Sequence, residues 1–506
     1  MNRKDRRAAR ATPAAGGRSP ARLFQQALHQ HEAGRYADAA ALYRTLLTAA
    51  PHEPELHYNL GLALAQAGQT RDAVTAWRTA LALRPLYPKA SNNLGMTLAE
   101  LGETVEAEQC LSFALAQTPD SPEILSNLAG VLRQQGRLPD AEALFHRAIR
   151  LHPAFADAYN SLGVLNMDRR RLPQAIQCFK RAIELQPDHA KAHFNLSLGL
   201  LTQGRFKDGW AEHEWRWRGG GRHLSPRPFR RPLWSEDDPA GRRILLHSEQ
   251  GFGDTVQFIR LAKALADAGA TVIAEVPQAL VRLVATVPGV SEVVERDAPL
   301  PPFDAHLPLL SLPHRLGLAL DDIPADIPYL SAPSDAAARW RTRLRDVPGL
   351  HVGLVWAGDP RPDDPFANAI DRRRSVSLSL LAPVLTVPGI TIVSLQKGSP
   401  AAQLSSGHPG PAILDWTEDL LDFADTAALT QALDLVITVD TAMAHVAGAL
   451  GRPVWILSRF DGCWRWLENR DDTPWYPTAR LFRQTGPGDW APVIDAVARS
   501  LAAMSS

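Results

Sequence analysis

The sequence predicts an α plus α/β protein: a solenoid of helical hairpins, followed by two α/β lobes built on parallel sheets. Two observations predict this division. In the first half, prolines recur every 34 residues without a gap, at Pro51, Pro85, Pro119, Pro153 and Pro187. In the second half, apolar strands alternate with glycine-containing loops and amphipathic helices. The length of 506 residues also favours several domains over one compact core.

Composition excludes several classes of function. The chain has 54 basic and 54 acidic residues, so no overall positive field attracts nucleic acid or an anionic membrane. We find no apolar run near the ~18 residues that cross a bilayer, and the basic start lacks the apolar segment of a signal peptide. The cysteines Cys110, Cys178 and Cys463 are isolated, which predicts no disulfide framework and a reducing, cytoplasmic compartment.

Three further columns share the 34-residue period. They are Leu60, Leu94, Leu128, Leu162 and Leu196; Gly34, Gly68, Gly102, Gly136 and Gly204; and Ala39, Ala73, Ala107, Ala141 and Ala175. We interpret each unit as two helices, in which glycine ends the first, alanine lets the second approach closely, and proline separates the units. The pattern resembles tetratricopeptide repeats, about six of them over residues 21–218, after a basic tail, residues 1–20, predicted to be disordered.

A polar column follows the same period, at Asn59, Asn93, Asn127 and Asn195. One hypothesis is that these amides line a groove and bind the backbone of an extended peptide, since an amide both donates and accepts. The other is that each amide bonds a neighbouring repeat. A similar asparagine ladder occurs in O-linked N-acetylglucosamine transferases. His189 and His193 have a two-ligand spacing, but without a third ligand we predict no metal.

The solenoid is predicted to end in a tryptophan-rich cap. Trp210, Trp215 and Trp217 would cover its open apolar end, before a linker over residues 219–242. Residues 243–335 then predict one Rossmann-like lobe and residues 336–506 a second, because strand, loop, helix and strand alternate in both. The economical arrangement is two lobes that face a cleft.

A glycine loop, Gly251-Phe-Gly253-Asp254, follows the first strand of the first lobe. A dinucleotide site is disfavoured because Val256 replaces the third glycine, and because Asp254 would repel a pyrophosphate at about 4 Å by several kcal/mol. A P-loop is excluded because no Gly-Lys-Ser/Thr follows the loop. Asp254 is then either a general base or a helix N-cap, and the loop by itself does not separate these hypotheses.

In the second lobe a strand ends at Asp440 and a helix begins directly after it. The amides at that helix start, near Thr441, are suited to a diphosphate, while Asp440 would bond sugar hydroxyls. His445 is either a phosphate donor or a packed core histidine. Three cations, Arg372, Arg374 and Lys397, follow strands in the same lobe and are predicted to complete a phosphate-binding rim.

Together, the G-F-G-D loop, the G-L-V-W-A-G strand, the stretch Asp371–Ser375 and V-D-T-A-M-A-H-V-A-G-A-L-G-R-P resemble heptosyltransferase-like (family 9) glycosyltransferases over residues 243–505. The resemblance implies a GT-B fold, a nucleotide-diphosphate sugar as co-substrate, and no metal or other cofactor. It implies that Asp254 is the general base, and that the first lobe, with Gly251, Gly253 and Gln257, is the acceptor side. The donor would lie against Asp440, Thr441, Ala442, Met443 and His445.

The expected function is therefore transfer of a sugar from a nucleotide donor to a protein or glycan acceptor that the repeats present. Two alternatives stay open. The chain is either a repeat scaffold whose α/β half has lost turnover, or a protein that binds a sugar nucleotide as a sensor.

Overall fold

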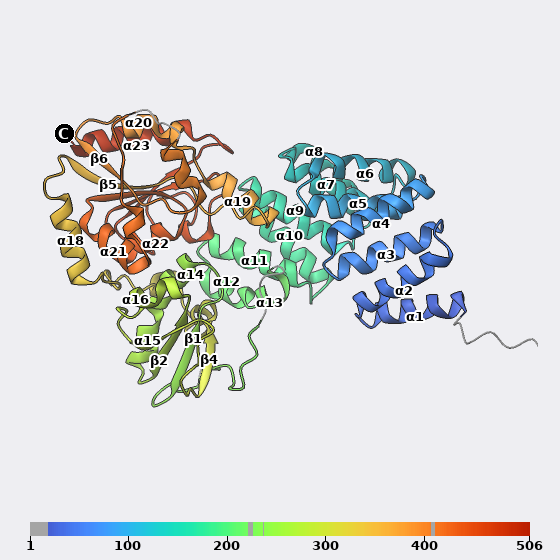
Figure 1. Cartoon of the computed structure of the whole chain (residues 1–506), viewed down its shortest axis with the longest axis horizontal. Helices are drawn as coiled ribbons and strands as arrows, with labels where there is room; N and C mark the ends of the chain where they lie inside the picture. Colours follow the sequence, from blue (N-terminus) through green and yellow to red (C-terminus); the bar gives the residue numbers. More distant parts are fainter. Residues whose placement is uncertain (1–18, 221–225, 236, 406–409, 506) are drawn as a thin grey trace, which may run out of the picture. The chain divides into compact units, whose positions relative to one another are not determined.

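The computed structural model describes residues 19–220, 226–235, 237–405 and 410–505 (Figure 1). The chain divides into two compact units, residues 1–155 and 156–506. The predicted basic tail falls on residues 1–18, which lie outside the described part, apart from its last two residues. Ser19 and Pro20 belong to the first helix: the Ser19 side chain accepts a hydrogen bond from Arg22 N, and Pro20 occupies the first turn.

The first unit contains four helical hairpins among its described residues. Their helices are α1 (Pro20–Glu32), α2 (Tyr36–Ala49), α3 (Pro54–Gln66), α4 (Thr70–Leu83), α5 (Pro88–Glu100), α6 (Thr104–Gln117), α7 (Pro122–Gln134) and α8 (Leu138–Leu151). The glycine column ends the first helix of each hairpin with φ between +72° and +82°, a region that favours glycine. The alanine column is fully buried at each close approach between helices.

The second unit begins with two further hairpins and a short helix. Their helices are α9 (Ala156–Asp168), α10 (Leu172–Leu185), α11 (Ala190–Thr202), α12 (Phe206–His213) and α13 (Arg216–Gly219). Here the turn glycine is replaced once: Arg170 occupies that place with φ +56°. The predicted solenoid is confirmed as an architecture.

The first lobe has a four-stranded parallel sheet in the order β3-β2-β1-β4. Its strands are β1 (Arg243–His247), β2 (Thr271–Val276), β3 (Val290–Glu295) and β4 (Ala305–Pro308), and its helices are α14 (Phe252–Phe258), α15 (Ala262–Asp267), α16 (Val281–Val284) and α17 (Leu312–Arg315). The segment predicted as a linker touches this sheet at one point among its described residues, where Leu233 pairs with His306 and Trp234 N donates to His306 O at 2.9 Å.

The second lobe has six parallel strands in the order β10-β9-β8-β5-β6-β7. They are β5 (Leu350–Val355), β6 (Ile390–Ser394), β7 (Leu414–Asp415), β8 (Leu435–Val439), β9 (Val454–Ser458) and β10 (Ala479–Arg483). The helices are α18 (Ser334–Leu344), α19 (Pro365–Arg374), α20 (Ala382–Leu385), α21 (Phe423–Ala432), α22 (Ala442–Ala449) and α23 (Ala491–Ser505). Counted within the lobe, this is the 3-2-1-4-5-6 order of dinucleotide-binding Rossmann sheets, so the prediction of Rossmann-like lobes is confirmed.

Candidate functional site

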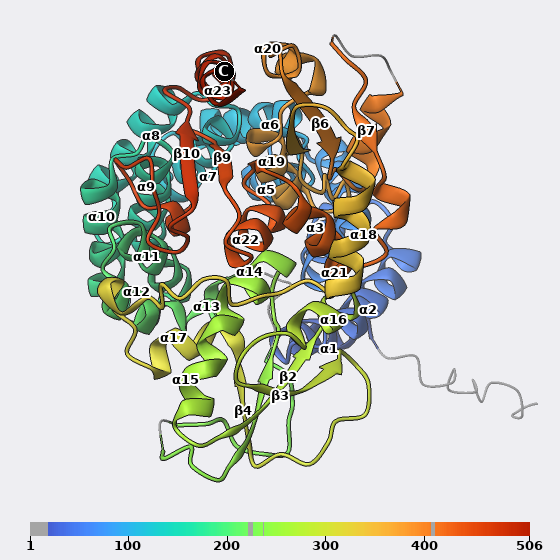
Figure 2. The ribbon, with the colours of Figure 1, turned by 90° about the vertical axis from the view of Figure 1, so that its left-hand side faces the viewer.

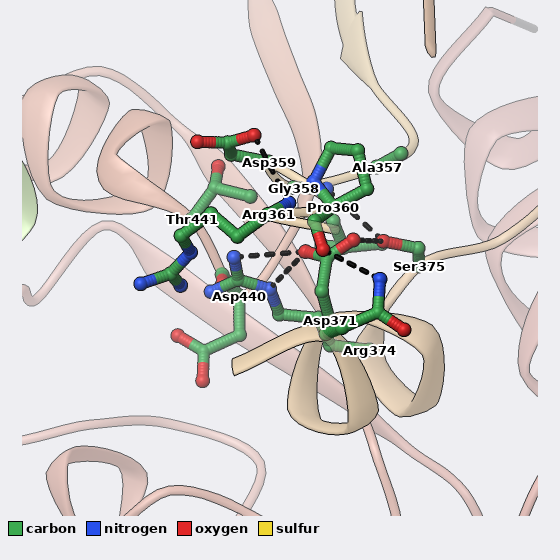
Figure 3. Close-up of polar contacts among 12 residues, drawn as sticks. Ala357, Gly358, Asp359, Pro360, Arg361, Asp371, Arg374, Ser375, Asp440 and Thr441 are labelled. Carbon is green, nitrogen blue, oxygen red and sulfur yellow. Dashed lines mark hydrogen bonds and ion pairs between the residues drawn. The ribbon is translucent and has the colours of Figure 1, made fainter. Parts of the chain in front are cut away.

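The strand order of the second lobe reverses between β5 and β8, the two neighbouring strands at its centre. The chain leaves β5 toward β6 on one side and leaves β8 toward β9 on the other, so the loops that follow β5 and β8 diverge. Ligands of open α/β sheets bind at such a divergence. The loop after β8 holds Asp440 and Thr441, and the loop after β5 holds Gly358 and Arg361 (Figure 3).

Thr441 organises the start of α22. Its hydroxyl accepts a hydrogen bond from Met443 N at 3.3 Å and lies 3.0 Å from the Thr438 hydroxyl. The half-buried carboxylate of Asp440 has no hydrogen-bond partner within the described residues. A capped helix start beside a carboxylate without a hydrogen-bond partner provides donors for an anion and an acceptor for hydroxyls.

The loop after β5 encloses a buried ion pair, and α19 supplies both partners. Arg374 donates to Asp371 Oδ1 at 3.0 Å and to the main-chain oxygen of Asp440 at 3.0 Å, while the Ser375 hydroxyl bonds Asp371 and receives Gly358 N–H (Figure 3). From the sequence, Arg372–Arg374 are expected in the loop that follows the strand Leu350–Val355. Instead, they form the last turn of α19. This helix begins at Pro365, where the Asp364 side chain caps its start and accepts a hydrogen bond from Ala367 N at 2.9 Å.

The three cations predicted to form a phosphate-binding rim differ in their partners within the protein. Arg374 is committed to Asp371 and Asp440, and Lys397 donates to the carbonyls of Thr417 and Leu420 at 2.8 and 2.7 Å. Arg372 is exposed and forms no ion pair within the described part of the chain. Arg361, which the sequence analysis did not single out, is also exposed and has φ +41°, an unfavourable conformation for a residue with a side chain. Whether these cations hold a phosphate stays a prediction.

Asp254 lies in the first turn of α14, at the carboxyl edge of the first lobe. Its Oδ2 accepts Gly251 N–H at 2.9 Å, as a residue that caps a helix start does. Its Oδ1 forms an ion pair with Arg465 from the second lobe. The carboxylate therefore has the capping geometry, and it also lies where the two lobes meet, with a side chain 16% exposed.

The two lobes approach closely beside Asp254. A Cβ on Gly253 would lie 2.8 Å from His445 Cδ2 and 3.3 Å from Ala442 Cα, so only glycine lets the loop rest on the first turn of α22. Figure 2 shows α14 and α22 side by side. The predicted base and the predicted diphosphate anchor thus lie next to one another.

Arg465 is a site residue that the sequence analysis missed. It lies in a 3-10 turn, Trp464–Trp466, after β9, and its Nε donates to Gln257 Oε1 at 2.8 Å. Burial works to lower the pKa of the guanidinium, but the charge of Asp254, the Cys463 sulfur and then the charge of Asp440 together outweigh it, so the pKa lies above its usual value. A signal existed in the sequence, since an arginine in the segment after a buried strand falls under the same carboxyl-edge rule, although Arg459 and Arg470 share that segment and the sequence does not single out Arg465.

His445 is held inside the second lobe. Its Nδ1 lies 2.9 Å from the Tyr476 hydroxyl, and its ring stacks on Trp466 at 5.3 Å. Burial, followed by the nearby charges of Arg465 and Arg260, holds the pKa of His445 well below its usual value, so the imidazole is neutral. This geometry favours the packed-histidine hypothesis over a charged phosphate donor.

The last repeat is built into the first lobe. Arg216 is fully buried, and it donates to Glu249 at 3.0 Å, to Glu214 at 2.7 Å and to Ser311 at 2.7 Å. Burial raises the pKa of Glu249, although Arg216 opposes that rise. Glu249 lies two residues before Gly251, the first residue of the glycine loop, so the repeats help to hold that loop.

The predicted tryptophan cap contributes to the same junction. Trp210 packs edge-on against Phe258 at 5.6 Å and Trp464 at 5.3 Å, one from each lobe. Trp215 stacks on His193 at 4.0 Å. The apolar end of the solenoid is therefore covered by the lobes as well as by its own tryptophans.

The asparagine column forms bonds between repeats. Asn127 Nδ2 donates to Asn92 at 2.9 Å and Asn195 Nδ2 donates to Asn160 at 2.9 Å, while Asn93 Nδ2 lies 3.3 Å from the Tyr58 hydroxyl. These contacts favour the stacking hypothesis for three of the four positions. The peptide-groove hypothesis, which includes Asn59, stays a prediction.

The two histidines with a metal-ligand spacing, His189 and His193, have partners within the protein. His189 caps α11 and His193 bonds Glu212 at 2.5 Å, and no cluster of three possible metal ligands occurs in the part of the chain that the structure describes. Over the same residues, no helix is both long enough and apolar enough to span a bilayer.

Family models match two parts of the chain. Residues 24–70, 58–122, 98–165 and 156–189 match tetratricopeptide repeats. Residues 420–457 match glycosyltransferase family 9 (heptosyltransferase). The second match spans α21, β8 and α22, and so contains the helix start at Thr441. Both predicted resemblances are confirmed over these ranges.

Individual proteins are similar over part of the chain. Protein FlbA of Caulobacter vibrioides is 29% identical over 329 residues, 60% of this chain and 53% of that protein. The chain thus spans about half the length of this curated relative. Among solved structures, MamA from Desulfovibrio magneticus RS-1 is 23% identical with a TM-score of 0.31, over 35% of this chain and 99% of that one. YrrB, described as a TPR protein with an unusual peptide-binding site, is 22% identical with a TM-score of 0.29, over 34% and 88%.

Proposed function

From a chain that joins tetratricopeptide repeats to a glycosyltransferase family 9 segment, we propose an enzyme that transfers a sugar from a nucleotide-diphosphate donor to a hydroxyl acceptor. The observation that carries the proposal is the contact between Gly253 and the first turn of α22. It sets Asp254, the candidate base, beside the helix start that is suited to a diphosphate.

In the proposed reaction the acceptor hydroxyl attacks the anomeric carbon while the bond to the diphosphate breaks. Asp254 takes the hydroxyl proton, and the amides at the start of α22 receive the departing diphosphate. Asp440, whose carboxylate is unengaged within the described residues, bonds sugar hydroxyls. Arg372 lies at the outer rim of the donor site. Arg374 and Lys397 support that rim through their hydrogen bonds to the backbone carbonyls of Asp440, Thr417 and Leu420.

The repeats present the acceptor, a protein or a glycan, in this proposal. Their role is supported by the repeat matches and by the buried bonds from Arg216 to Glu249, which join the last repeat to the loop that carries Asp254. The isolated cysteines, all unpaired, favour a reducing compartment, so we place the reaction in the cytoplasm.

The test is Asp254→Asn, which keeps the shape of the side chain and removes the base. We expect transfer to fall by about 10²- to 10⁴-fold, the usual contribution of a general base, while nucleotide binding persists. Asp267→Asn is the matched control, because that carboxylate lies in the same lobe on an exposed ion pair with Lys263. Transfer that survives in Asp254→Asn would reduce Asp254 to a capping residue.

A second candidate function has one observation in its favour. Asp254, Arg374 and Lys397 all form bonds within the protein, as expected of a repeat scaffold whose lobes no longer turn over a donor. Donor hydrolysis by the purified protein separates the candidates. Hydrolysis that requires Asp254 supports the enzyme. Donor binding without hydrolysis supports a sugar-nucleotide sensor. The absence of both donor binding and hydrolysis supports the scaffold.

A further inference from the structure

Arg465 is the cation that joins the two halves of the candidate site. Its guanidinium pairs with Asp254 of the first lobe and is held by Gln257 and by Cys463 Sγ, at 2.8 and 3.3 Å. The guanidinium lies 4.3 Å from the centre of the Trp464 ring, and its side chain is 14% exposed. Arg465 is therefore fixed in place where the lobes meet, and its side chain is not fully buried.

Other cations of the second lobe are less suited to act at the point of reaction. Arg374 and Lys397 are committed to Asp371 and to backbone carbonyls. Arg361 and Arg372 are exposed, and within the described residues neither bonds the first lobe. Arg465 alone among these five pairs with the candidate base, which rests against the first turn of α22.

We propose that Arg465 is the catalytic cation that stabilises the departing diphosphate, and that its charge passes to the diphosphate from Asp254 during transfer. This inference rests on the proposed function. Before the reaction the charge of Arg465 is balanced by the Asp254 carboxylate. As the acceptor oxygen forms its bond to the anomeric carbon, its proton neutralises Asp254, and the breaking bond leaves its electron pair on the diphosphate.

The charges therefore balance without movement of the guanidinium. At the moment Asp254 becomes neutral, the diphosphate gains one negative charge, and Arg465 stabilises that charge instead. Such an interaction is stronger in the transition state than with bound donor, which is what accelerates a reaction. The ion pair to Asp254 is thus part of the mechanism and not a block to it.

This arrangement makes an unusual prediction about binding. In Asp254→Asn the carboxylate that competes for Arg465 is absent before any reaction, so a nucleoside diphosphate should bind about tenfold more tightly than to the wild-type chain. In Arg465→Gln the same product should bind at least about tenfold more weakly, the loss of one charged hydrogen bond. Arg465→Lys, which keeps the charge, should recover most of that loss.

The experiment is isothermal titration calorimetry of the full chain with ADP, GDP, UDP, CDP and dTDP, in buffer without divalent metal. The double variant Asp254→Asn with Arg465→Gln is the decisive one. If the gain in Asp254→Asn acts through Arg465, it disappears in the double variant. If the gain persists there, loss of a nearby negative charge explains it and the assignment of Arg465 is wrong.

Arg282→Gln is the control for loosened lobes. Arg282 joins the same two lobes elsewhere, through Asp422 at 3.0 Å and Asp425 at 3.3 Å, so its loss should leave diphosphate affinity unchanged. Circular-dichroism melting of each variant confirms that it is folded. If the wild-type chain binds no diphosphate, the proposed function fails together with this inference. If it binds one and Arg465→Gln binds it equally well, only the inference fails.

Discussion

At the scale of single residues, the loop after β5 depends on close packing around Gly358. A Cβ at this position would lie 2.1 Å from Asp371 Oδ1 and 2.2 Å from Arg374 Nη2, and both side chains are already held by other bonds. Glycine is required here for space and not for its backbone conformation. The loop after β5 can approach α19 only because position 358 lacks a side chain.

Gly358→Ala is therefore expected to lower the free energy of unfolding by about 1–3 kcal/mol, the usual cost of overpacking. Chemical denaturation followed by circular dichroism measures it. Gly486→Ala is the matched control, because a Cβ at Gly486 meets nothing within 4 Å. Equal stability of the two variants would show that the Asp371–Arg374 pair shifts aside at little cost.

At the scale of secondary-structure elements, the fifth hairpin departs from the others at its turn. Arg170 takes the place that glycine holds in the other hairpins, with φ +56°. Its guanidinium lies 5.5 Å from the centre of the Phe460 ring and 3.9 Å from Glu468, in the second lobe. A left-handed conformation costs a residue with a side chain about 1–2 kcal/mol. Contacts between hairpin and lobe offset that cost.

Two substitutions separate the strain from the contacts. Both Arg170→Ala and Arg170→Gly lose the contacts, but only alanine keeps the strain, so the glycine variant should be more stable by about 1 kcal/mol. Thermal and chemical unfolding of both variants give the difference. Gly136→Ala provides the reference cost at the equivalent turn, where φ is +81°. If the glycine variant is no more stable than the alanine variant, the backbone at position 170 is not strained.

At the scale of the whole molecule, the last two repeats belong to the same compact unit as the α/β lobes. Trp210 is 1% exposed within an aromatic cluster that includes Phe258 and Trp464. Arg216 neutralises the buried Glu249. Removal of these repeats would expose the cluster and leave an unpaired carboxylate in the core, each a costly change.

A chain of residues 226–506 is therefore expected to aggregate or to melt well below a chain of residues 156–506. Loss of the Trp210 packing alone costs about 3–5 kcal/mol, as for other buried tryptophans. Size-exclusion chromatography and melting of the two fragments measure the difference. Full-length Trp210→Ala, which removes the ring and keeps the repeats, tests the same contact. Equal stability of the fragments would show that the lobes fold without the repeats.

Local patterns in the sequence were sufficient for much of the architecture. The 34-residue period, the turn glycines and the buried alanines depend on contacts between neighbouring segments, and they predicted the hairpins. Alternation of strand and helix predicted the parallel lobes for the same reason. The carboxyl-edge rule found the positions of these site residues, because Asp440 and Thr441 directly follow β8 and Asp254 belongs to the glycine loop and helix start that come after β1.

Only the tertiary structure decided which partners these residues have. Asp254 and Arg465 are 211 residues apart in the chain, and Arg374 bonds the carbonyl of Asp440 66 residues away. The sequence therefore predicted that Arg374 and Lys397 face a ligand, whereas the fold gives both cations partners within the protein. Strand order, burial and the approach of one lobe to the other determine these pairings, and they arise from long-range packing that no local pattern encodes.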